Sequence, residues 1–194
     1  MLCSNCKNKL EDYMNFCPYC GTKISSYNDV FIDPRDNNVY KTVKIGKQIW
    51  MARNLNYAAE GSKCYERKYG RIYDWATAKN ACPAGWHLPN NDEWLTLVDF
   101  AGGIVTAGKN LKTKNGWDDF GNGIDIFGFS ALPSGYSDSE GYFDDAGCFA
   151  RWWSATENGA HYAYSWGMGY DFDGTYWNSD GKSHLFSIRC LQDQ

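Results

Sequence analysis

The sequence predicts a mixed α+β domain, with short helices, small antiparallel sheets and long loops, behind a small metal-stabilised module. Three observations predict this architecture. Four of the eight cysteines lie within residues 3–20, while the other four are scattered from 64 to 190. One segment, residues 89–103, carries a complete helix signature. Aromatic residues form 17% of the chain and glycines number 20, which favours turns and ring packing over long helices.

Length and charge limit the classes of function. A chain of 194 residues can form one full domain plus a small appendage. The formal net charge of −4 disfavours nucleic acid as a partner, because phosphate contacts need clustered Lys and Arg. No apolar run reaches the roughly 18 residues of a membrane span. The start, "MLCSNCKNKL", lacks the apolar core of a secretion signal, so we expect a cytoplasmic protein.

The N-terminal cysteines have the spacing of a zinc site. Cys3, Cys6, Cys17 and Cys20 form a C-x2-C-x10-C-x2-C pattern. Zinc takes four thiolates at tetrahedral corners about 2.3 Å away, and a two-residue gap lets both sulfurs of one turn face the same ion. Residues 1–24 are too few to bury a core, so the metal would hold them together. We therefore predict structural Zn2+ in a segment that resembles a short zinc ribbon, with two disulfides as the alternative.

The other four cysteines show no such pattern. Cys64, Cys82, Cys148 and Cys190 lie far apart in the chain, and we expect them to remain buried, inert thiols. A disulfide between Cys64 and Cys82 is the alternative for an oxidising compartment. A nucleophilic cysteine would need a nearby base, and the sequence places no histidine beside any thiol.

Local signals divide the rest of the chain. Residues 25–33 are polar and turn-rich, which predicts a linker before a domain at 34–194. Residues 39–55 form two alternating runs around Gly46 and Lys47, as in a β-hairpin. Asp74 can cap a short helix that begins at Trp75.

The clearest helix follows. Asn90 as N-cap and Glu93 three residues later form a variant of the capping box. The inward positions of this helix are Trp94, Leu97, Val98 and Ala101, and Gly102 can end it. Beyond it, residues 116–147 are dense in Gly, Asp and Ser and predict a long irregular region. Short strands are predicted at 151–156, 161–170 and 184–192.

Several motifs carry a family resemblance. The stretches "YGRIYDWATAKNACPAGWHLPNNDEW", "GFSALPSGY", "WWSAT" and "FSIRCLQD" occur in this order and together resemble the Fibrobacter succinogenes major paralogous domain, over residues 34–193. That family is similar to C-type lectin-like domains and to formylglycine-generating, sulfatase-modifying domains. The resemblance implies a compact C-type lectin-like fold, with adjacent first and last strands and long loops on one side. It implies no settled activity.

The chain lacks the residue patterns that bind metal ions in enzymes and lectins of related fold. Formylglycine-generating enzymes bind copper through a close pair of cysteines near the C-terminus, where this chain has Cys190 alone. Calcium-dependent lectins carry an E-P-N or Q-P-D tripeptide, absent here, and W-N-D, which "WNSD" matches only with an inserted Ser179. Asp171, Asp173 and Asp180 can supply some of the six to eight oxygens that Ca2+ takes, but the D-x-D-G pattern also occurs in ordinary turns, so Ca2+ is the weaker alternative as a cofactor. We expect a protein that is not an enzyme, with a degenerate oxidoreductase as an alternative.

The aromatic stretch 161–178 is the candidate binding region. From Tyr162 to Met168 large and small residues alternate, which predicts a strand whose large face packs inward. After residue 169 rings mix with Asp, Asn, Ser and Gly, as on protein-binding surfaces, which predicts an exposed loop over 170–180. The proposed ligand-binding residues are Trp166, Tyr170, Asp171, Phe172, Asp173, Tyr176, Trp177, Asn178 and Asp180.

These residues predict a recognition module for a protein or carbohydrate (glycan) ligand. C-type lectin-like domains also serve as variable targets of diversity-generating retroelements. Those targets vary just before the last strand, where this loop lies, so the resemblance extends to that role. The alternative is a structural or interaction domain without a small ligand.

Overall fold

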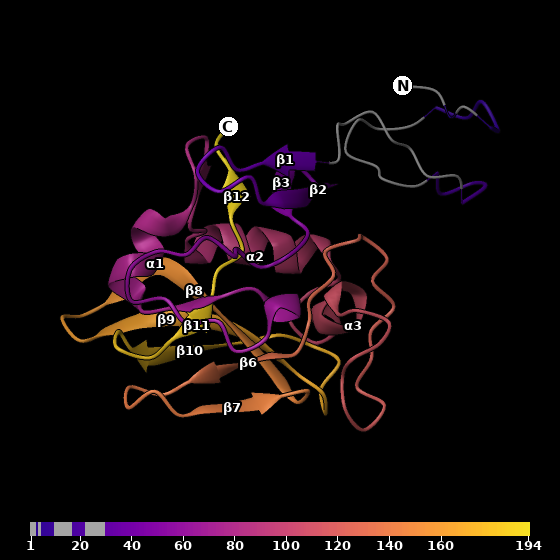
Figure 1. The fold of residues 1–194 in the computed structure, drawn as a ribbon. Helices are drawn as coiled ribbons and strands as arrows, with labels where there is room; N and C mark the ends of the chain where they lie inside the picture. Colours follow the sequence, from indigo (N-terminus) through magenta and orange to yellow (C-terminus); the bar gives the residue numbers. More distant parts are fainter. Residues whose placement is uncertain (1–2, 4, 10–16, 22–29) are drawn as a thin grey trace.

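The computed structural model describes residues 3, 5–9, 17–21 and 30–194 (Figure 1). Two sheets and three short helices make up the part from residue 30 onward. The first sheet has the strand order β1 (Val30–Ile32), β2 (Val39–Ile45), β3 (Gln48–Met51), β12 (Leu191–Gln192), β5 (Trp86–His87). The second has the order β10 (Tyr176–Gly181), β9 (Tyr162–Gly169), β8 (Phe149–Asn158), β11 (Phe186–Ser187), β4 (Ile72–Tyr73). The mixed helix-and-sheet prediction is confirmed.

The predicted hairpin and both capped helices are present. β2 and β3 pair antiparallel around Gly46, whose φ of 61° a glycine adopts without strain. Asp74 accepts a hydrogen bond from the backbone N–H of Thr77 at the start of α1 (Trp75–Ala81). Asn90 and Glu93 form the full capping box of α2 (Asn91–Phe100). A third helix, α3 (Ala107–Leu111), and a 3-10 turn, η1 (Arg67–Tyr69), complete the set.

The first and last strands lie in the same sheet but are not neighbours, in contrast to what the family resemblance implies, because β2 and β3 separate β1 from β12. β12 lies between β3 and β5, with Leu191 opposite both Trp50 and His87 (Figure 1). None of the helices in the described part of the chain is long and apolar enough to cross a bilayer.

The domain begins earlier than the sequence indicates. Val30–Ile32, which we assigned to the linker, pairs with β2 as strand β1. Asp33 is fully buried and bonds Arg35, with 2.7 Å between Oδ2 and Nη2. In the sequence this segment looks polar because Asp33 and Arg35 are both charged. In the structure the two charges neutralise each other. The rest of the predicted linker, and residues 10–16 between the two cysteine pairs, lie outside the described residues.

The predicted irregular region also contains strands. β6 (Ser134–Ser137) and β7 (Phe143–Ala146) form a hairpin inside residues 116–147. β6 joins the second sheet through Gly135, which pairs with Ala150 of β8. Four-residue strands rich in Ser and Asp carry no alternation of apolar residues, so the sequence gives no sign of them.

Helix α2 lies between the two sheets and fills the main core (Figure 1). The ring of Trp94 lies 5.0 Å from that of Trp50 in β3, 6.0 Å from Trp152 in β8 and 6.2 Å from Trp166 in β9. Leu97 and Val98 are buried on the same side of the helix. Aromatic rings therefore supply the bulk that Val, Ile and Leu supply in most cores.

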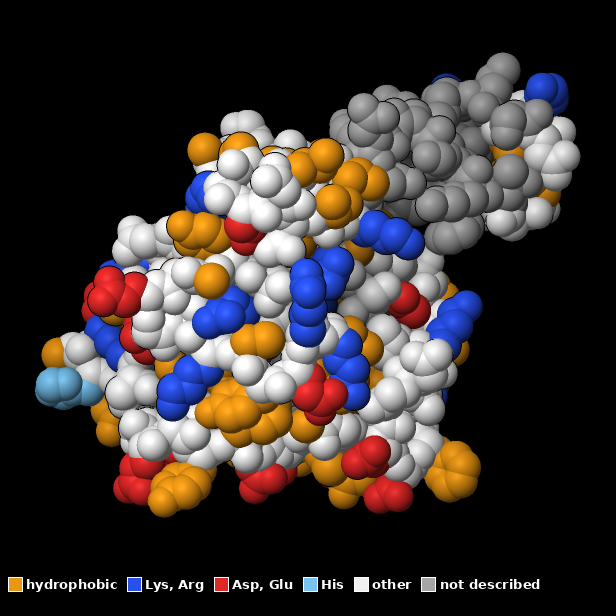
Figure 2. All heavy atoms as spheres, viewed as in Figure 1, with side chains coloured by type: hydrophobic (Ala, Val, Ile, Leu, Met, Phe, Trp, Pro, Cys, Tyr) orange, Lys and Arg blue, Asp and Glu red, His pale blue; other side chains and the backbone are white. Residues whose placement is uncertain are grey.

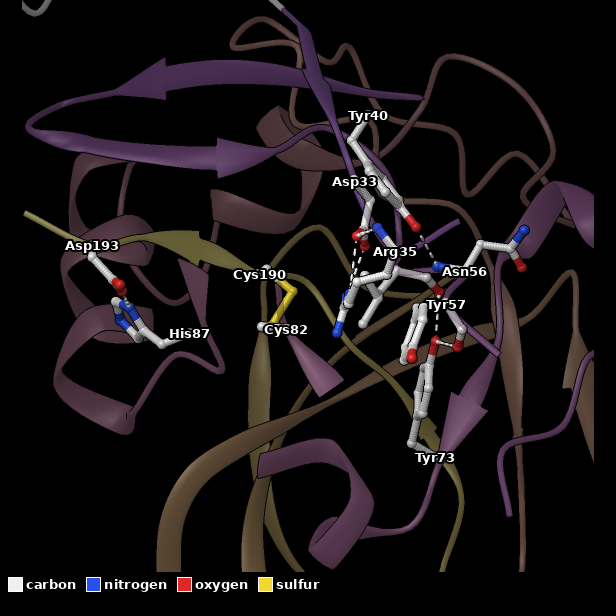
Figure 3. Close-up of a disulfide and its surroundings, with 11 residues drawn as sticks. Asp33, Arg35, Tyr40, Asn56, Tyr57, Tyr73, Cys82, His87, Cys190 and Asp193 are labelled. Atoms are coloured by element: carbon white, nitrogen blue, oxygen red, sulfur yellow. Dashed lines mark hydrogen bonds and ion pairs between the residues drawn. A yellow bond between two sulfur atoms is a disulfide. The ribbon is translucent and has the colours of Figure 1, made fainter. Parts of the chain in front are cut away.

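A disulfide lies in a second core cluster and corrects the prediction of thiols. Cys82, the C-cap of α1, bonds Cys190, with 2.08 Å between the sulfurs (Figure 3). The two cysteines are 108 residues apart in sequence, which hides their proximity. Cys64 and Cys148 remain thiols, but Cys64 is exposed rather than buried.

The disulfide should contribute substantially to stability. It closes a loop of 108 residues in the unfolded chain, and losing such a cross-link typically costs about 2–5 kcal/mol. We expect the Cys82→Ala, Cys190→Ala double variant to lose about that much free energy of unfolding in urea melts. Cys64→Ser is the control and should melt like the native chain. An unchanged midpoint in the double variant would contradict the assignment.

His87 should make stability depend on pH. Its Nδ1 lies 2.6 Å from Asp193 Oδ1 (Figure 3). Its Nε2 lies 2.9 Å from Glu93 Oε1. Burial lowers the pKa of His87, but these hydrogen bonds raise it by more, so the net shift is upward. The stabilisation is then fully present below the unfolded pKa of about 6.5 and is lost as pH rises through the higher folded value.

The measurement is a pair of urea melts at about pH 5.5 and pH 8.5, on either side of that range. His87→Gln should cost more stability at the acid pH than at the alkaline one. His161→Gln, at an exposed position, is the matched control. An equal cost at both pH values would show that the imidazolium contributes nothing.

Candidate functional site

The four N-terminal cysteines meet in one cluster. Their sulfurs all lie within 4.8 Å of one another. Cys3 Sγ is 3.6 Å from Cys20 Sγ, and Cys6 Sγ is 3.4 Å from Cys17 Sγ. A tetrahedral Zn2+ with four sulfurs about 2.3 Å away separates those sulfurs by about 3.8 Å, so the cluster has the dimensions of a zinc site.

Neighbouring donors favour the thiolate of Cys6, whereas burial raises the pKa of Cys17 to about 12. The backbone N–H of Cys6 points at Cys3 Sγ over 3.5 Å, and Asn8 Nδ2 donates to Cys6 Sγ over 3.3 Å. The backbone and side-chain hydrogen bonds of Asn8 lower the pKa of Cys6. Such second-shell donors orient metal-binding sulfurs and stabilise their charge. Among the described residues, these four cysteines form the one cluster of metal-ligating side chains.

The predicted loop over 170–180 is in fact a short loop and a strand. Residues 170–175 turn away from β9, and Tyr176–Gly181 return as β10, an edge strand antiparallel to β9. The sequence misses the strand because its residues are polar. The backbone bonds to β9, rather than β-propensity, determine its conformation.

A buried lysine donates hydrogen bonds to the backbone of the turn 170–175 from the interior of the protein. Lys112 is fully buried, and its Nζ donates to the carbonyl oxygens of Gly169 (2.9 Å) and Phe172 (3.0 Å). Burial lowers the pKa of this ammonium. The backbone of the turn bonds α3 and its approach, from Lys109 N to Asp173 O (2.6 Å) and from Thr175 N to Ile104 O (2.8 Å).

Two glycines allow this close approach. A Cβ at Gly108 of α3 would lie 1.9 Å from the carbonyl oxygen of Gly174, and one at Gly121 would lie 2.3 Å from that of Tyr170. Any larger residue would push the turn away. The backbone of the candidate loop is therefore fixed by what lies under it, and its outward side chains contribute little to its shape.

The predicted ligand residues do not form one surface. Successive residues of β10 point to opposite faces of the sheet. Tyr176, Asn178 and Asp180 share the face of Gly167 and Ser165. Trp177 lies on the other face, beside Tyr164, with 5.7 Å between ring centroids.

On the face of Tyr176, Asn178 and Asp180, most side chains contact other parts of the protein. Asp180 Oδ1 accepts from Arg151 Nη1 over 2.9 Å, and Asp180 Oδ2 accepts from Ser165 Oγ over 2.5 Å. The ring of Tyr176 covers Gly167, where a Cβ would lie 2.5 Å from it. Burial raises the pKa of Tyr176. Both carboxylate oxygens of Asp180 therefore take part in internal contacts.

Trp166 does not reach a ligand surface, and its assignment is corrected. It is 2% exposed, and its ring stacks in the main core against Trp94. Its Nε1 donates to Asn91 Oδ1 at the start of α2 (3.1 Å). The alternation that places Trp166 on the large-residue face also buries it.

Exposed apolar side chains do gather beside the turn. Phe172 is 41% exposed, Trp177 54% and Val105 64%. Ile104 joins them, since its carbonyl accepts from Thr175 N and lies against Gly174, which also meets the ring of Phe172. We call this surface, consisting of Ile104, Val105, Phe172 and Trp177, the apolar margin.

Sequence reasoning missed part of this surface. Ile104 and Val105 directly follow the two glycines that end α2. Two consecutive apolar residues just after the end of a helix, outside any periodic pattern, could have indicated that Ile104 and Val105 are exposed. Asp171 and Asp173 flank the margin as exposed carboxylates, and Asp173 lies 3.7 Å from Lys109 Nζ.

Two family models match the chain. The Fibrobacter succinogenes major domain matches residues 43–192, and a zinc-ribbon domain matches residues 2–24. No curated protein and no solved structure matches it.

The cysteine cluster should hold one zinc ion per chain and act independently of the larger domain. Elemental analysis of protein prepared without added metal should show this zinc. Cys17→Ser should release it, yet leave the thermal transition of residues 30–194 within about 1 °C, because no core residue of that domain is altered. A shift of many degrees would mean that the two parts share a core.

The two rings at the start of β10 should differ in their effect on stability. Trp177→Ala should cost less than about 1 kcal/mol in denaturant melts, because half of its surface is exposed. Tyr176→Ala should cost more, about 1–3 kcal/mol, because its ring covers Gly167. Equal costs would show that the two faces of β10 are packed alike.

Proposed function

The chain belongs to the Fibrobacter succinogenes major domain family, with a zinc ribbon at its N-terminus, and from that premise we propose a non-catalytic recognition module. It binds a protein or glycan ligand through the turn 170–175, β10 and the apolar margin. The family description names a domain and no reaction, so the proposal depends on the surface of this chain.

The observation that carries the proposal is the apolar margin on a rigid support. Large rings exposed on a fixed backbone lose little entropy on binding, which is the usual design of a recognition surface. Lys112 and the close backbone contacts of Gly108 provide that support here. Asp171 and Asp173 add polarity beside the rings.

The same support suits a variable surface. Because buried groups fix the backbone of the turn, its outward side chains can change without disturbing the fold. We therefore keep the role of variable target of a diversity-generating retroelement within the proposal. The pairing of β12 with β3 supports a C-type lectin-like fold for the domain.

Two other functions are less well supported. An oxidoreductase of the formylglycine-generating kind needs thiols near the C-terminus, and Cys190 is bonded to Cys82. Nucleic acid would need a continuous basic area. On the face seen in Figure 2, Lys and Arg side chains are interleaved with hydrophobic and acidic ones.

The test is a screen of the full chain against a glycan array and a display library of random decapeptides. We expect any ligand to bind the Phe172→Ala, Trp177→Ala double variant at least about tenfold more weakly, because exposed rings at a binding centre contribute that much or more. Tyr142→Ala removes an exposed ring on the β6–β7 turn and should have no effect. A ligand that binds the double variant as tightly as the native chain would contradict the proposal.

A further inference from the structure

The outer edge of β10 is open for pairing. β10 is the last strand of the second sheet and pairs with β9 in continuous register from Tyr176 to Gly181. In the described part of the chain, its backbone bonds join it to β9 and to the turn at His184. In an antiparallel edge strand, alternate residues present their N–H and C=O groups outward.

This edge lacks the features by which proteins block such pairing. Edge strands are usually protected by proline, by outward lysine, by a bulge or by being very short. β10 has the sequence YWNSDG, without proline or lysine, and its register with β9 has no shift. Its one charge, Asp180, is neutralised by an ion pair with Arg151. By contrast β1, at the edge of the first sheet, is three residues long.

We infer that β10 accepts an extended peptide segment of a partner protein as an additional strand of the sheet. The inference rests on the proposed function and names its partner. Backbone hydrogen bonds along the edge supply affinity, and side chains on the two faces supply specificity. Trp177 and Tyr176 lie on opposite faces of β10, so two consecutive residues of the peptide, pointing to opposite faces, would lie beside one ring each.

The charges beside β10 indicate a basic peptide. Asp171 and Asp173 are exposed just before the strand. Lys109 Nζ lies 3.7 Å from Asp173, so Asp171 is the carboxylate that a basic residue of the peptide would meet. A peptide with Lys or Arg at this end and an apolar residue opposite Trp177 complements the edge.

A second copy of this chain fits less well. The six residues of β10 span only about 20 Å. Pairing of two copies along this edge alone would therefore bury less surface than the roughly 1,000 Å² of a specific dimer interface. Each copy also carries a net charge of −4 and would bring its own carboxylates to the contact.

The experiment uses the full chain and basic decapeptides selected from a random display library. Asn178 and Ser179 are adjacent, so one of their N–H groups points outward and the other toward β9. We expect one of the variants Asn178→Pro and Ser179→Pro to melt like the native chain, because proline is tolerated where the N–H faces out. That variant should bind the peptides at least about tenfold more weakly, since it loses an edge hydrogen bond and crowds the added strand. Ser179→Ala keeps its N–H and is the control.

The peptide gives a second readout. N-methylation of alternate amides should weaken binding in one of the two alternating sets and spare the other, since a strand bonds through every second residue. Equal effects of both sets, native affinity in the folded proline variant, or a library without a binder would overturn the inference. The inference would also be overturned if the native chain formed a dimer that is lost in the proline variant. A second copy of the chain, rather than a partner peptide, would then be the strand that pairs with β10. If Phe172→Ala, Trp177→Ala abolishes binding while the folded proline variant retains it, the recognition module stands and the added strand fails.

Discussion

The packing of Trp94 against both sheets is the contact on which the rest of the structure depends. In the part of the chain that is described, the two sheets have no strand in common, and α2 fills the space between them. Trp94 contacts Trp50 on one side and Trp152 and Trp166 on the other. Because Trp166 belongs to β9, and β9 carries β10, this contact also helps to position the candidate surface.

Features that act over a few residues could be predicted from the sequence. The hairpin at Gly46, the cap at Asp74 and the capping box of Asn90 each involve groups within four positions of one another. Contacts between distant segments could not be predicted. The bond between Cys82 and Cys190 depends on how α1 and the last strand pack, and no spacing rule expresses that.

The candidate site shows the same division. Composition correctly locates a stretch with exposed rings, since Phe172 and Trp177 are on the surface. It cannot distinguish them from Trp166, because burial there depends on the position of α2. Nor can it find the support of the turn, since Lys112 reads as an ordinary surface lysine until its ammonium is seen against the carbonyls of Gly169 and Phe172.

The place of β12 in the first sheet has a consequence for biosynthesis. β12 comes last in the order of elements, yet it lies between β3 and β5 and bonds both. While residues 191–192 are still inside the ribosome, β3 and β5 have unsatisfied edges and Cys82 has no partner. Folding of the first sheet can therefore be completed only after residues 191–192 have left the ribosome, and until then β3 and β5 each keep an unpaired edge.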